Sequence, residues 1–288
     1  MKVFVTGASG QLGHDVCLEL NRRGIENIGI SSKDVDICDA AAVKNALRAF
    51  APDAVIHCAA YTAVDRAEDE PEKCREINVN GTANIAKACR EIGAKMLYIS
   101  TDYVFNGLGT QPWDADCKDY APLSVYGQSK LDGELAVAEN LNRFFIVRTA
   151  WVFGMNGKNF VKTMLNVGKT HDTVRVVNDQ IGTPTYTPDL AVLLCDMIAT
   201  DKYGYYHATN EGGYISWYDF TCEIYRQAGC STKVIPVTTE EYGLSRAKRP
   251  ENSRLDKSKL NAAGFHRLPD WHDALRRYLH DLHHAGLC

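Results

Sequence analysis

The sequence lacks the long apolar and basic runs that mark membrane proteins and nucleic-acid-binding proteins. No stretch approaches the roughly 18 consecutive apolar residues of a membrane span. The opening MKVFVTGASGQ has too short an apolar run for a secretory signal. The 36 acidic residues slightly outnumber the 32 basic ones, and no basic run of the kind that tracks phosphates is present. We therefore expect neither a membrane nor a nucleic acid as a partner.

Cysteine pairs and metal-ligand spacings are also missing. The ten cysteines are scattered and form no CxxC pair, which predicts free, mostly buried thiols in a cytoplasmic protein. His280 and His283 lie three apart on a predicted helix, a spacing that could bind a metal. No acidic or cysteine partner has matching spacing, so we favour a solvated helix face and assign no metal ligand.

What the sequence does contain is an alternation of short β-branched runs and longer helical patterns. The runs predict strands at 2–7, 27–31, 53–60, 95–101 and 143–150, and helices at 10–24, 39–50, 71–93 and from 124 onward. The strands are almost continuously apolar, which is typical of strands buried on both faces. The sequence therefore predicts an α/β fold, a Rossmann-type doubly wound parallel sheet with helices on each side.

The pattern loosens after residue 150, which predicts a smaller second lobe. Helical patterns at 159–169, 189–200 and 216–229 alternate with strand patterns at 174–179 and 204–210. We expect residues 1–150 to form the dinucleotide-binding domain, to which the chain returns at about 172–200, and residues 151–288 to form mainly a substrate-binding lobe. A ligand cleft is expected between them, at the carboxyl ends of the strands.

Three glycines follow the first predicted strand with the spacing GxxGxxG. Gly7, Gly10 and Gly13 suit a tight turn, a close approach to a pyrophosphate and close packing of helix on strand. The helix that follows presents free N–H groups and a positive dipole end to phosphates. A plain tight turn is the alternative, but the position between strand and helix at the chain start favours a dinucleotide.

The second predicted strand ends without the carboxylate that binds the ribose diol in many dinucleotide sites. Ser31, Ser32 and Lys33 stand there instead. Without that charge a 2′-phosphate is not repelled, and Lys33 could pair with one, so both NADH and NADPH remain possible. Asp36 and Ile37 could flank the adenine, although Asp36 could equally cap a loop.

A tyrosine and a lysine four residues apart form the candidate catalytic pair. Tyr126 and Lys130 share one face of a predicted helix, and Thr101 ends a central strand whose carboxyl end faces the cofactor. A free tyrosine has a pKa of about 10. A nearby ammonium lowers that pKa, which suits proton transfer to a carbonyl oxygen. Alone the pair would be ordinary helix surface; with the glycine loop it predicts catalysis.

Several motifs together resemble the extended short-chain dehydrogenase/reductases and, within them, the dTDP-4-dehydrorhamnose reductase family. They are TGASGQLG, AAYTAVDRAEDEP, STDYVFNG, PLSVYGQSKLDGE, RTAWVFG, NFVKTML, NDQIGTPTYTPDLA and RPENSRLD, and they extend from residue 1 to about 260. The resemblance implies an NAD(P)H-dependent oxidoreductase that reduces the 4-keto group of dTDP-4-dehydro-L-rhamnose, the last step of dTDP-rhamnose biosynthesis. A nucleotide sugar is then the partner, and the protein is a monomer or a homodimer.

The resemblance also implies roles for particular residues. Tyr126 donates the proton, Lys130 tunes Tyr126 and binds the nicotinamide ribose, and Thr101 polarises the carbonyl. The cofactor-binding set implied, with the glycine loop included, is Gly7, Gly10, Gln11, Leu12, Gly13, Asp36, Ile37, Ala60, Tyr61, Thr62, Ile99, Tyr126 and Lys130. The substrate-binding set implied is Thr101, Asp102, Trp151, Gln180 and Arg254.

Two of these residues have structural alternatives, and two other positions depart from the family. Trp151 could be apolar filling between the lobes, and Arg254 could form a surface salt bridge. Cys58 stands where relatives often have asparagine. Asp15 falls where some relatives place a glutamate that helps to bind a bridging Mg²⁺, so Mg²⁺ is a possible further cofactor.

Two other functions share these features. A nucleotide-sugar epimerase or dehydratase of the same superfamily would keep the glycine loop and the Tyr–Lys pair. Dehydratases also need acidic partners beside the threonine, and here Asp102 is followed by tyrosine. A non-catalytic regulatory subunit, like the beta subunit of methionine adenosyltransferase, would share the fold. The intact Thr101, Tyr126 and Lys130 argue against that alternative.

Overall fold

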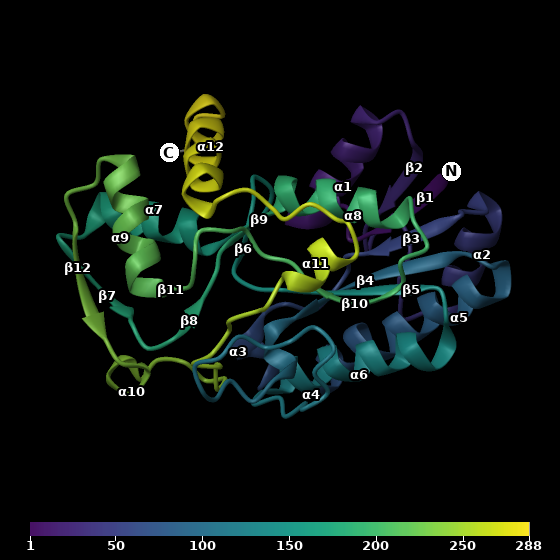
Figure 1. The fold of residues 1–288 in the computed structure, drawn as a ribbon, viewed down its shortest axis with the longest axis horizontal. Coiled ribbons are helices and arrows are strands. Elements are labelled where there is room, and N and C mark those ends of the chain that lie inside the picture. Colours follow the sequence, from purple (N-terminus) through teal and green to yellow (C-terminus); the bar gives the residue numbers. More distant parts are fainter. Residues whose placement is uncertain (288) are drawn as a thin grey trace.

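The computed structural model describes residues 1–287, which form a parallel sheet covered by helices and a smaller second lobe beside it (Figure 1). In spatial order the strands are β10 (Gly204–His207), β5 (Phe144–Thr149), β4 (Lys95–Thr101), β3 (Ala54–His57), β1 (Lys2–Thr6) and β2 (Glu26–Ile30). All neighbouring strands pair in parallel. The predicted doubly wound α/β fold is confirmed.

Helices cover both faces of this sheet because its strands are apolar on both. One face carries α1 (Gln11–Arg22) and α8 (Thr187–Ile198), and the other carries α2 (Ala40–Phe50), α5 (Thr82–Ile92) and α6 (Val125–Asn140). Along β1, Val3 and Val5 pack with the first pair of helices and Phe4 packs with the other three. Successive side chains of a strand point to opposite faces, so both sides of β1 lie in a hydrophobic core.

The second lobe has its own hydrophobic core. Its elements are α7 (Phe160–Thr170), α9 (Trp217–Ala228), α10 (Thr239–Tyr242), α12 (Trp271–His284) and the strand pairs β6–β9 (Val152–Phe153, Thr185–Tyr186), β7–β12 (Thr173–Val177, Lys233–Val237) and β8–β11 (Ile181–Gly182, Ile215–Ser216). Side chains of α7, α9 and α12 pack around Phe153 and Tyr186. In Figure 1 these elements stand beyond the carboxyl ends of the sheet strands. The short helix α11 (Ser258–Ala262) lies instead against β10.

The chain passes between the two lobes more than once. Within and just after the stretch 172–200, β7 pairs with β12 in the second lobe, whereas α8 packs on α1 and β10 extends the main sheet beside β5. The reason lies in the side chains. α8 is apolar on nearly every face, so it suits a position that packs against both α1 and the sheet.

Side chains cap the starts of α2 and α9. The Asp39 carboxylate accepts hydrogen bonds from the N–H groups of Ala41 and Ala42 at the start of α2. Ser216 and Asp219 form a capping box at the start of α9. Such caps satisfy N–H groups that the first helical turn leaves unpaired.

The helical pattern predicted at 71–93 is not one regular α-helix. It consists of α4 (Pro71–Arg75), a π-helical segment η1 (Glu76–Gly81) and α5. The widened turn directs the Asn78 amide to Tyr61, whose N–H it accepts at 2.7 Å, and to the Ser129 hydroxyl at 2.9 Å. The π segment thus fastens the loop after β3 to α6, a type of distortion frequent at functional sites.

Further sequence predictions concern cysteines and membrane spans. The nine described cysteines are free; three are buried, six are half-buried and none of the nine is exposed. No helix within residues 1–287 is long and apolar enough to cross a membrane.

A fully buried ion pair joins α6 to β5. The Arg148 guanidinium donates to both carboxylate oxygens of Glu134, at 2.8 and 2.7 Å, and both side chains are almost fully buried. Arg148 also donates to the Tyr120 hydroxyl at 2.9 Å and to the Ala115 carbonyl at 3.2 Å. Every group of the pair is satisfied, and the pair holds α6 in place on the sheet.

Removing one member of this pair is expected to destabilise the fold. Glu134→Ala leaves an unpaired buried guanidinium, which costs about 3–5 kcal/mol. Urea denaturation measures the free energy of unfolding, with Glu139→Ala, an exposed change on the same helix, as the control. Equal stability of the two variants would contradict the prediction.

Candidate active site

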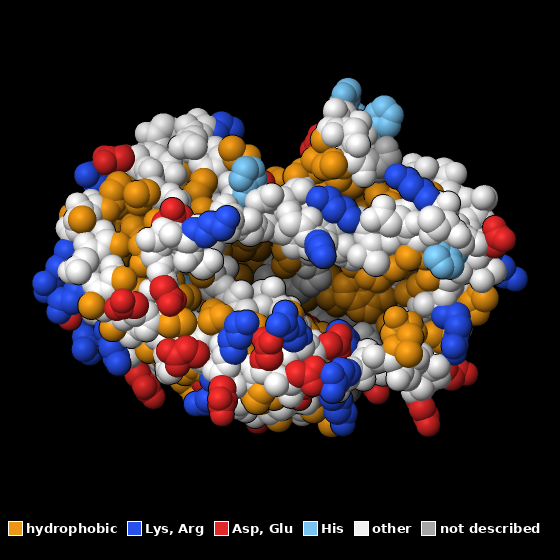
Figure 2. All heavy atoms as spheres, turned by 180° about the vertical axis from the view of Figure 1, so that it is seen from behind, with side chains coloured by type: hydrophobic (Ala, Val, Ile, Leu, Met, Phe, Trp, Pro, Cys, Tyr) orange, Lys and Arg blue, Asp and Glu red, His pale blue; other side chains and the backbone are white. Residues whose placement is uncertain are grey.

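A cavity of about 820 Å³ lies at the carboxyl ends of the central strands, where the second lobe meets the sheet. In Figure 2 one face of the molecule is hollowed near its centre, with hydrophobic side chains inside the hollow and charged ones around it. Most residues of the two predicted sets lie on the cavity wall: Gly7, Gly10, Gln11, Leu12, Gly13, Asp36, Ile37, Ala60, Thr62, Ile99, Thr101, Asp102, Tyr126, Lys130 and Trp151. Residues spread over 145 positions of sequence thus share one site.

The glycine loop forms one end of the cavity, and its glycines are required by close approach. Gly7 has a φ of +70°, and a Cβ there would lie 2.7 Å from the Ala59 backbone nitrogen. A Cβ at Gly13 would lie 2.3 Å from the Gly7 carbonyl oxygen. Gly10, the N-cap of α1, has no side-chain cap. The first N–H groups of α1 therefore remain available to a phosphate, so the site fits a dinucleotide.

The loop after β2 forms the adjoining wall. Ser31 and Ser32 line the cavity, and Asp34 binds both donors of Ser31: its backbone N–H at 2.8 Å and its hydroxyl at 2.7 Å. These hydrogen bonds lower the pKa of Asp34. A carboxylate therefore lies three residues beyond the strand end and is hydrogen-bonded to Ser31. Asp36 both lines the cavity and accepts the Cys38 N–H at 3.0 Å.

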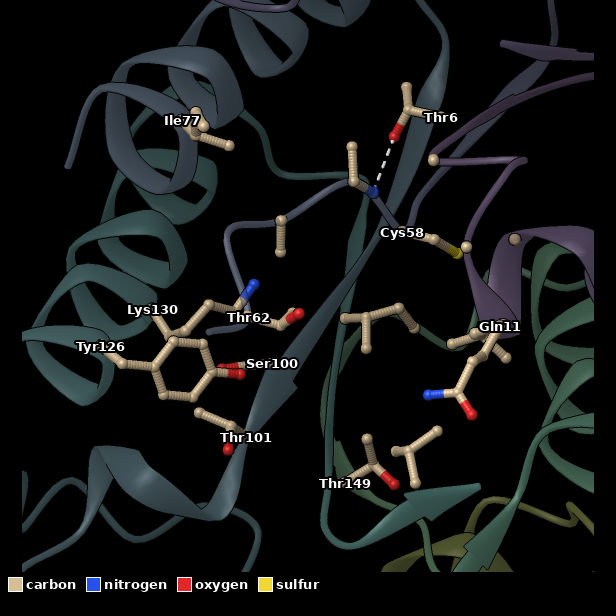
Figure 3. Close-up of a pocket in the computed structure, with 18 of the residues that line it drawn as sticks. Thr6, Gln11, Cys58, Thr62, Ile77, Ser100, Thr101, Tyr126, Lys130 and Thr149 are labelled. Atoms are coloured by element: carbon tan, nitrogen blue, oxygen red, sulfur yellow. Dashed lines mark hydrogen bonds between the residues drawn. The ribbon is translucent and has the colours of Figure 1, made fainter. Parts of the chain in front are cut away.

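The catalytic candidates meet at the other end of the cavity. Ser124 caps α6 by accepting the Gly127 N–H at 3.1 Å, which fixes the first turn that carries Tyr126. The Tyr126 hydroxyl points toward Ser100 and Thr101 at the end of β4, and Lys130 lies beside it on the same helix (Figure 3). A strand end and a helix face therefore bring together the three residues that the sequence proposes.

Burial decides the protonation of Tyr126. It raises the pKa of the phenol well above 10, and the Asp102 carboxyl raises the pKa further, while a hydrogen bond with Thr101 lowers it slightly. In the protein without ligand, burial outweighs any lowering of this pKa by Lys130; the role of Lys130 with cofactor bound stays a prediction. The Lys130 ammonium lies 4.0 Å from the centre of the Tyr98 ring, and burial lowers its own pKa to about 7. Tyr126 is thus a neutral phenol, the form that can donate a proton.

Two buried polar atoms beside Tyr126 have no hydrogen-bond partner within the described chain. They are the Ser100 hydroxyl oxygen and the Asp102 Oδ2. The other oxygen of Asp102 accepts the Thr101 hydroxyl at 3.0 Å, and burial raises the pKa of Asp102 to about 6. Unsatisfied buried polar atoms are costly. Their position on the cavity wall indicates that a polar ligand satisfies them.

Trp151 occupies a strained backbone position where the second lobe begins. Its φ of +52° lies in the left-handed region, which is rare for a bulky residue. Its ring stacks on Trp217 with centroids 3.7 Å apart, and Phe160 packs on Trp217 at 4.4 Å. All three rings line the cavity. Trp151 therefore packs between the lobes and also lines the cavity, and its contact with the substrate stays a prediction.

The remaining three predicted residues lie off the cavity wall. The Tyr61 hydroxyl donates to Glu70 at 2.9 Å, and the buried Gln180 amide donates to the Thr239 hydroxyl at 3.0 Å. The Arg254 guanidinium donates to the Asn252 side chain at 3.0 Å and forms no salt bridge within residues 1–287. Its assignment to a diphosphate and its alternative as a surface ion pair are both without support here.

Sequence reasoning missed several residues of the site. Lys158, Phe160 and Trp217 line the cavity, although they lie within or beside helical patterns whose apolar positions predict only packing. The one available signal was SWYDF, where an aromatic residue directly follows a helix cap. Local periodicity cannot tell which aromatic side chain faces a second lobe.

The described residues offer no group of three or more histidine, cysteine, aspartate or glutamate side chains that could hold a metal ion. His280 pairs with His284, Nε2 to Nε2 at 3.0 Å, on the exposed face of α12. Asp15 is buried and accepts the Thr187 hydroxyl, and burial raises its pKa. These contacts lend no support to the possible Mg²⁺.

Replacing Lys130 with methionine should stabilise the protein without ligand more at pH 6 than at pH 9. Burial lowers the folded-state pKa from 10.5 to about 7, so the unfolded chain binds more protons between these values. The wild-type free energy of unfolding therefore rises with pH across this window, and methionine removes that rise, worth roughly 2 kcal/mol from pH 6 to pH 9. Urea denaturation at both pH values measures it. Lys169→Met, on the exposed side of α7, is the control, and a difference independent of pH would refute the effect.

With this geometry established, comparison with known proteins identifies the family. Residues 1–284 match the family described as RmlD substrate binding domain. The spore coat polysaccharide biosynthesis protein SpsK of Bacillus subtilis (strain 168) is 42% identical, over 97% of this chain and 97% of that protein. The dTDP-4-dehydrorhamnose reductase of Streptomyces griseus is 43% identical, over 94% of this chain and 91% of its own. The crystal structure of the Bacillus anthracis dTDP-4-dehydrorhamnose reductase, in complex with NADP, has a TM-score of 0.93 at 42% identity and covers 97% of this chain and 99% of that one. The chain belongs to the RmlD substrate binding domain family.

Proposed function

We propose that the protein is a dTDP-4-dehydrorhamnose reductase, which reduces the 4-keto group of dTDP-4-dehydro-L-rhamnose to give dTDP-L-rhamnose. The observation that carries the proposal is that Tyr126, Lys130 and Thr101 meet at one end of a cavity whose other end is the glycine loop. Relatives with this name cover nearly the whole chain. Free thiols and a reduced cofactor suit a cytoplasmic enzyme.

The residues of the site divide between holding the cofactor and handling the proton. The N–H groups at the start of α1 bind the dinucleotide phosphates, and the loop after β2 borders the adenosine. NADH or NADPH, when bound, supplies the hydride to the keto carbon. Thr101 and Tyr126 hydrogen-bond the keto oxygen from the protein side and stabilise the negative charge that develops there.

Proton transfer completes the reaction. Tyr126 transfers its phenolic proton to the oxygen, which as an alkoxide is more basic than a phenolate even with a raised pKa. When ligands are bound, the positive charge of the Lys130 ammonium stabilises the phenolate that remains after proton transfer. The partnerless Asp102 oxygen and Ser100 hydroxyl offer an acceptor and a donor to the hydroxyl groups of the sugar.

The reaction is tested by mixing the purified protein with NADPH or NADH and dTDP-4-dehydro-L-rhamnose and following the loss of reduced-nicotinamide absorbance. We expect stoichiometric oxidation with formation of dTDP-L-rhamnose. Tight dinucleotide binding without oxidation would favour a non-catalytic subunit, and oxidation only with a different nucleotide sugar would reassign the substrate.

Tyr126→Phe should lower kcat by at least about 100-fold because it removes the proton donor. The affinity for NADPH should stay within about twofold, since the ring itself is retained. Tyr218→Phe, at a tyrosine of α9 outside the cavity wall, is the matched control. Wild-type turnover in Tyr126→Phe would show that Tyr126 is not the acid.

We propose that both NADH and NADPH are accepted and that Asp34 sets their ratio. Its carboxylate holds the Ser31 donors that a 2′-phosphate would use, and its charge repels that phosphate. Asp34→Asn should raise the NADPH-to-NADH ratio of kcat/KM by about 3- to 10-fold. Steady-state kinetics with each cofactor measure the ratio, with Asp172→Asn, exposed in the second lobe, as the control. An unchanged ratio would exclude Asp34 as the determinant.

A further inference from the structure

A segment of the second lobe lies across the glycine loop. Residues 154–159, here called the strap, connect β6 to α7. The Asn156 amide donates to the carbonyl oxygen of Ser9 at 2.8 Å and to that of Gly10 at 3.3 Å. These contacts hold the strap against the backbone that precedes α1, more than 140 residues away in sequence.

Hydrogen bonds also fix the strap at Asn159, its last residue, and from Lys162 on the helix that follows. The Asn159 amide donates to the Gln11 side chain at 3.0 Å and to the Gly154 carbonyl at 2.8 Å. Lys162, on α7, donates to the carbonyls of Met155 at 2.6 Å and Gly157 at 3.0 Å. The strap is therefore a hydrogen-bonded structure with a defined course.

Lys158 is the charged residue of the strap, and it is exposed at the cavity wall. Among the residues described on the cavity wall, Lys158 and Lys130 are the two that are lysine or arginine. Lys130 lies over the Tyr98 ring at the catalytic end. Lys158 forms no ion pair or hydrogen bond with residues 1–287, so its ammonium is available to a ligand.

A dinucleotide brings two negative charges to the start of α1. Backbone N–H groups and the helix dipole meet part of that charge. The Asn156 amide binds the Ser9 and Gly10 carbonyls, which holds the strap at this end of the helix. A cation two residues beyond Asn156 then completes the electrostatic match, because an ammonium binds phosphate as a point charge.

We propose that the strap is part of the dinucleotide site and that Lys158 binds the pyrophosphate of NADH or NADPH. The proposal rests on the proposed function only in taking a nicotinamide dinucleotide as the ligand. It makes the second lobe a contributor to cofactor binding. The competing ligand for the same cation is the diphosphate of the nucleotide sugar, and the test separates the two.

The test measures binding to the full-length protein without turnover, by quenching of the tryptophans at the cavity. The probes are NADPH, adenosine 2′-monophosphate and dTDP. Lys158→Ala should weaken NADPH binding about tenfold, the loss of one charge-assisted contact. It should leave adenosine 2′-monophosphate, which has no pyrophosphate, and dTDP within twofold of wild type. Lys169→Ala, at an exposed lysine of α7 off the cavity wall, should leave all three affinities unchanged.

Ionic strength and a second variant sharpen the result. The NADPH affinity of Lys158→Ala should fall less steeply with salt than that of the wild type, because one charge contact is gone. Lys158→Arg should retain most of the affinity. An NADPH affinity within twofold of the Lys169→Ala protein, or a loss confined to dTDP, would overturn the proposal. Neither outcome depends on which keto sugar the protein reduces, so failure of the proposed function would be seen separately.

Discussion

The contact between the loop after β1 and the loop after β3 leaves no room for a side chain, and the site depends on it. Gly7 adopts a left-handed conformation against the Ala59 backbone, and Gly13 lies against Gly7. This approach brings the start of α1 to the carboxyl edge of the sheet, where strand order reverses between β1 and β3. A bound phosphate thereby meets free N–H groups at the same edge of the sheet as the end of β4, from which β1 is separated by β3.

Burial is the second physical determinant, and it acts on charge. Tyr126 and Lys130 lie in surroundings that disfavour their charged forms, so the pKa of the phenol rises and that of the amine falls. In the protein without ligand, Tyr126 is therefore protonated, and burial disfavours the charged form of the neighbouring Lys130. A charged ligand in the cavity changes the electrostatic surroundings of both side chains. A site arranged in this way favours proton donation to a basic oxygen over spontaneous ionisation.

Both lobes supply residues to the cavity. The division of the sequence into a dinucleotide-binding domain and a substrate-binding lobe does not indicate this. The second lobe supplies the stacked rings of Trp151 and Trp217 and the strap that lies on the glycine loop. The strained backbone at Trp151 is stabilised by the stacking and by a hydrogen bond from the Thr185 N–H to the Trp151 carbonyl at 3.1 Å. Strain of about 1–3 kcal/mol at such a place is tolerated because the surrounding packing fixes it.

The sequence by itself determined the α/β class of the fold, the alternation of strands and helices along the chain and fifteen of the residues on the cavity wall. Local signals can be recognised in the sequence because they depend on residues that lie close together in it. Examples are the hydrophobicity of the strands, caps such as Asp39 and the spacing of Gly7, Gly10 and Gly13. Tertiary structure alone decided which aromatic rings and which lysine of the second lobe face the cavity, and it removed Gln180 and Arg254 from the wall. Burial in the folded protein also raises the pKa of Tyr126, whereas the sequence led us to expect a lowered pKa. The reason is physical: burial and long-range approach depend on what packs against a residue, and a residue's own neighbours in sequence do not carry that information.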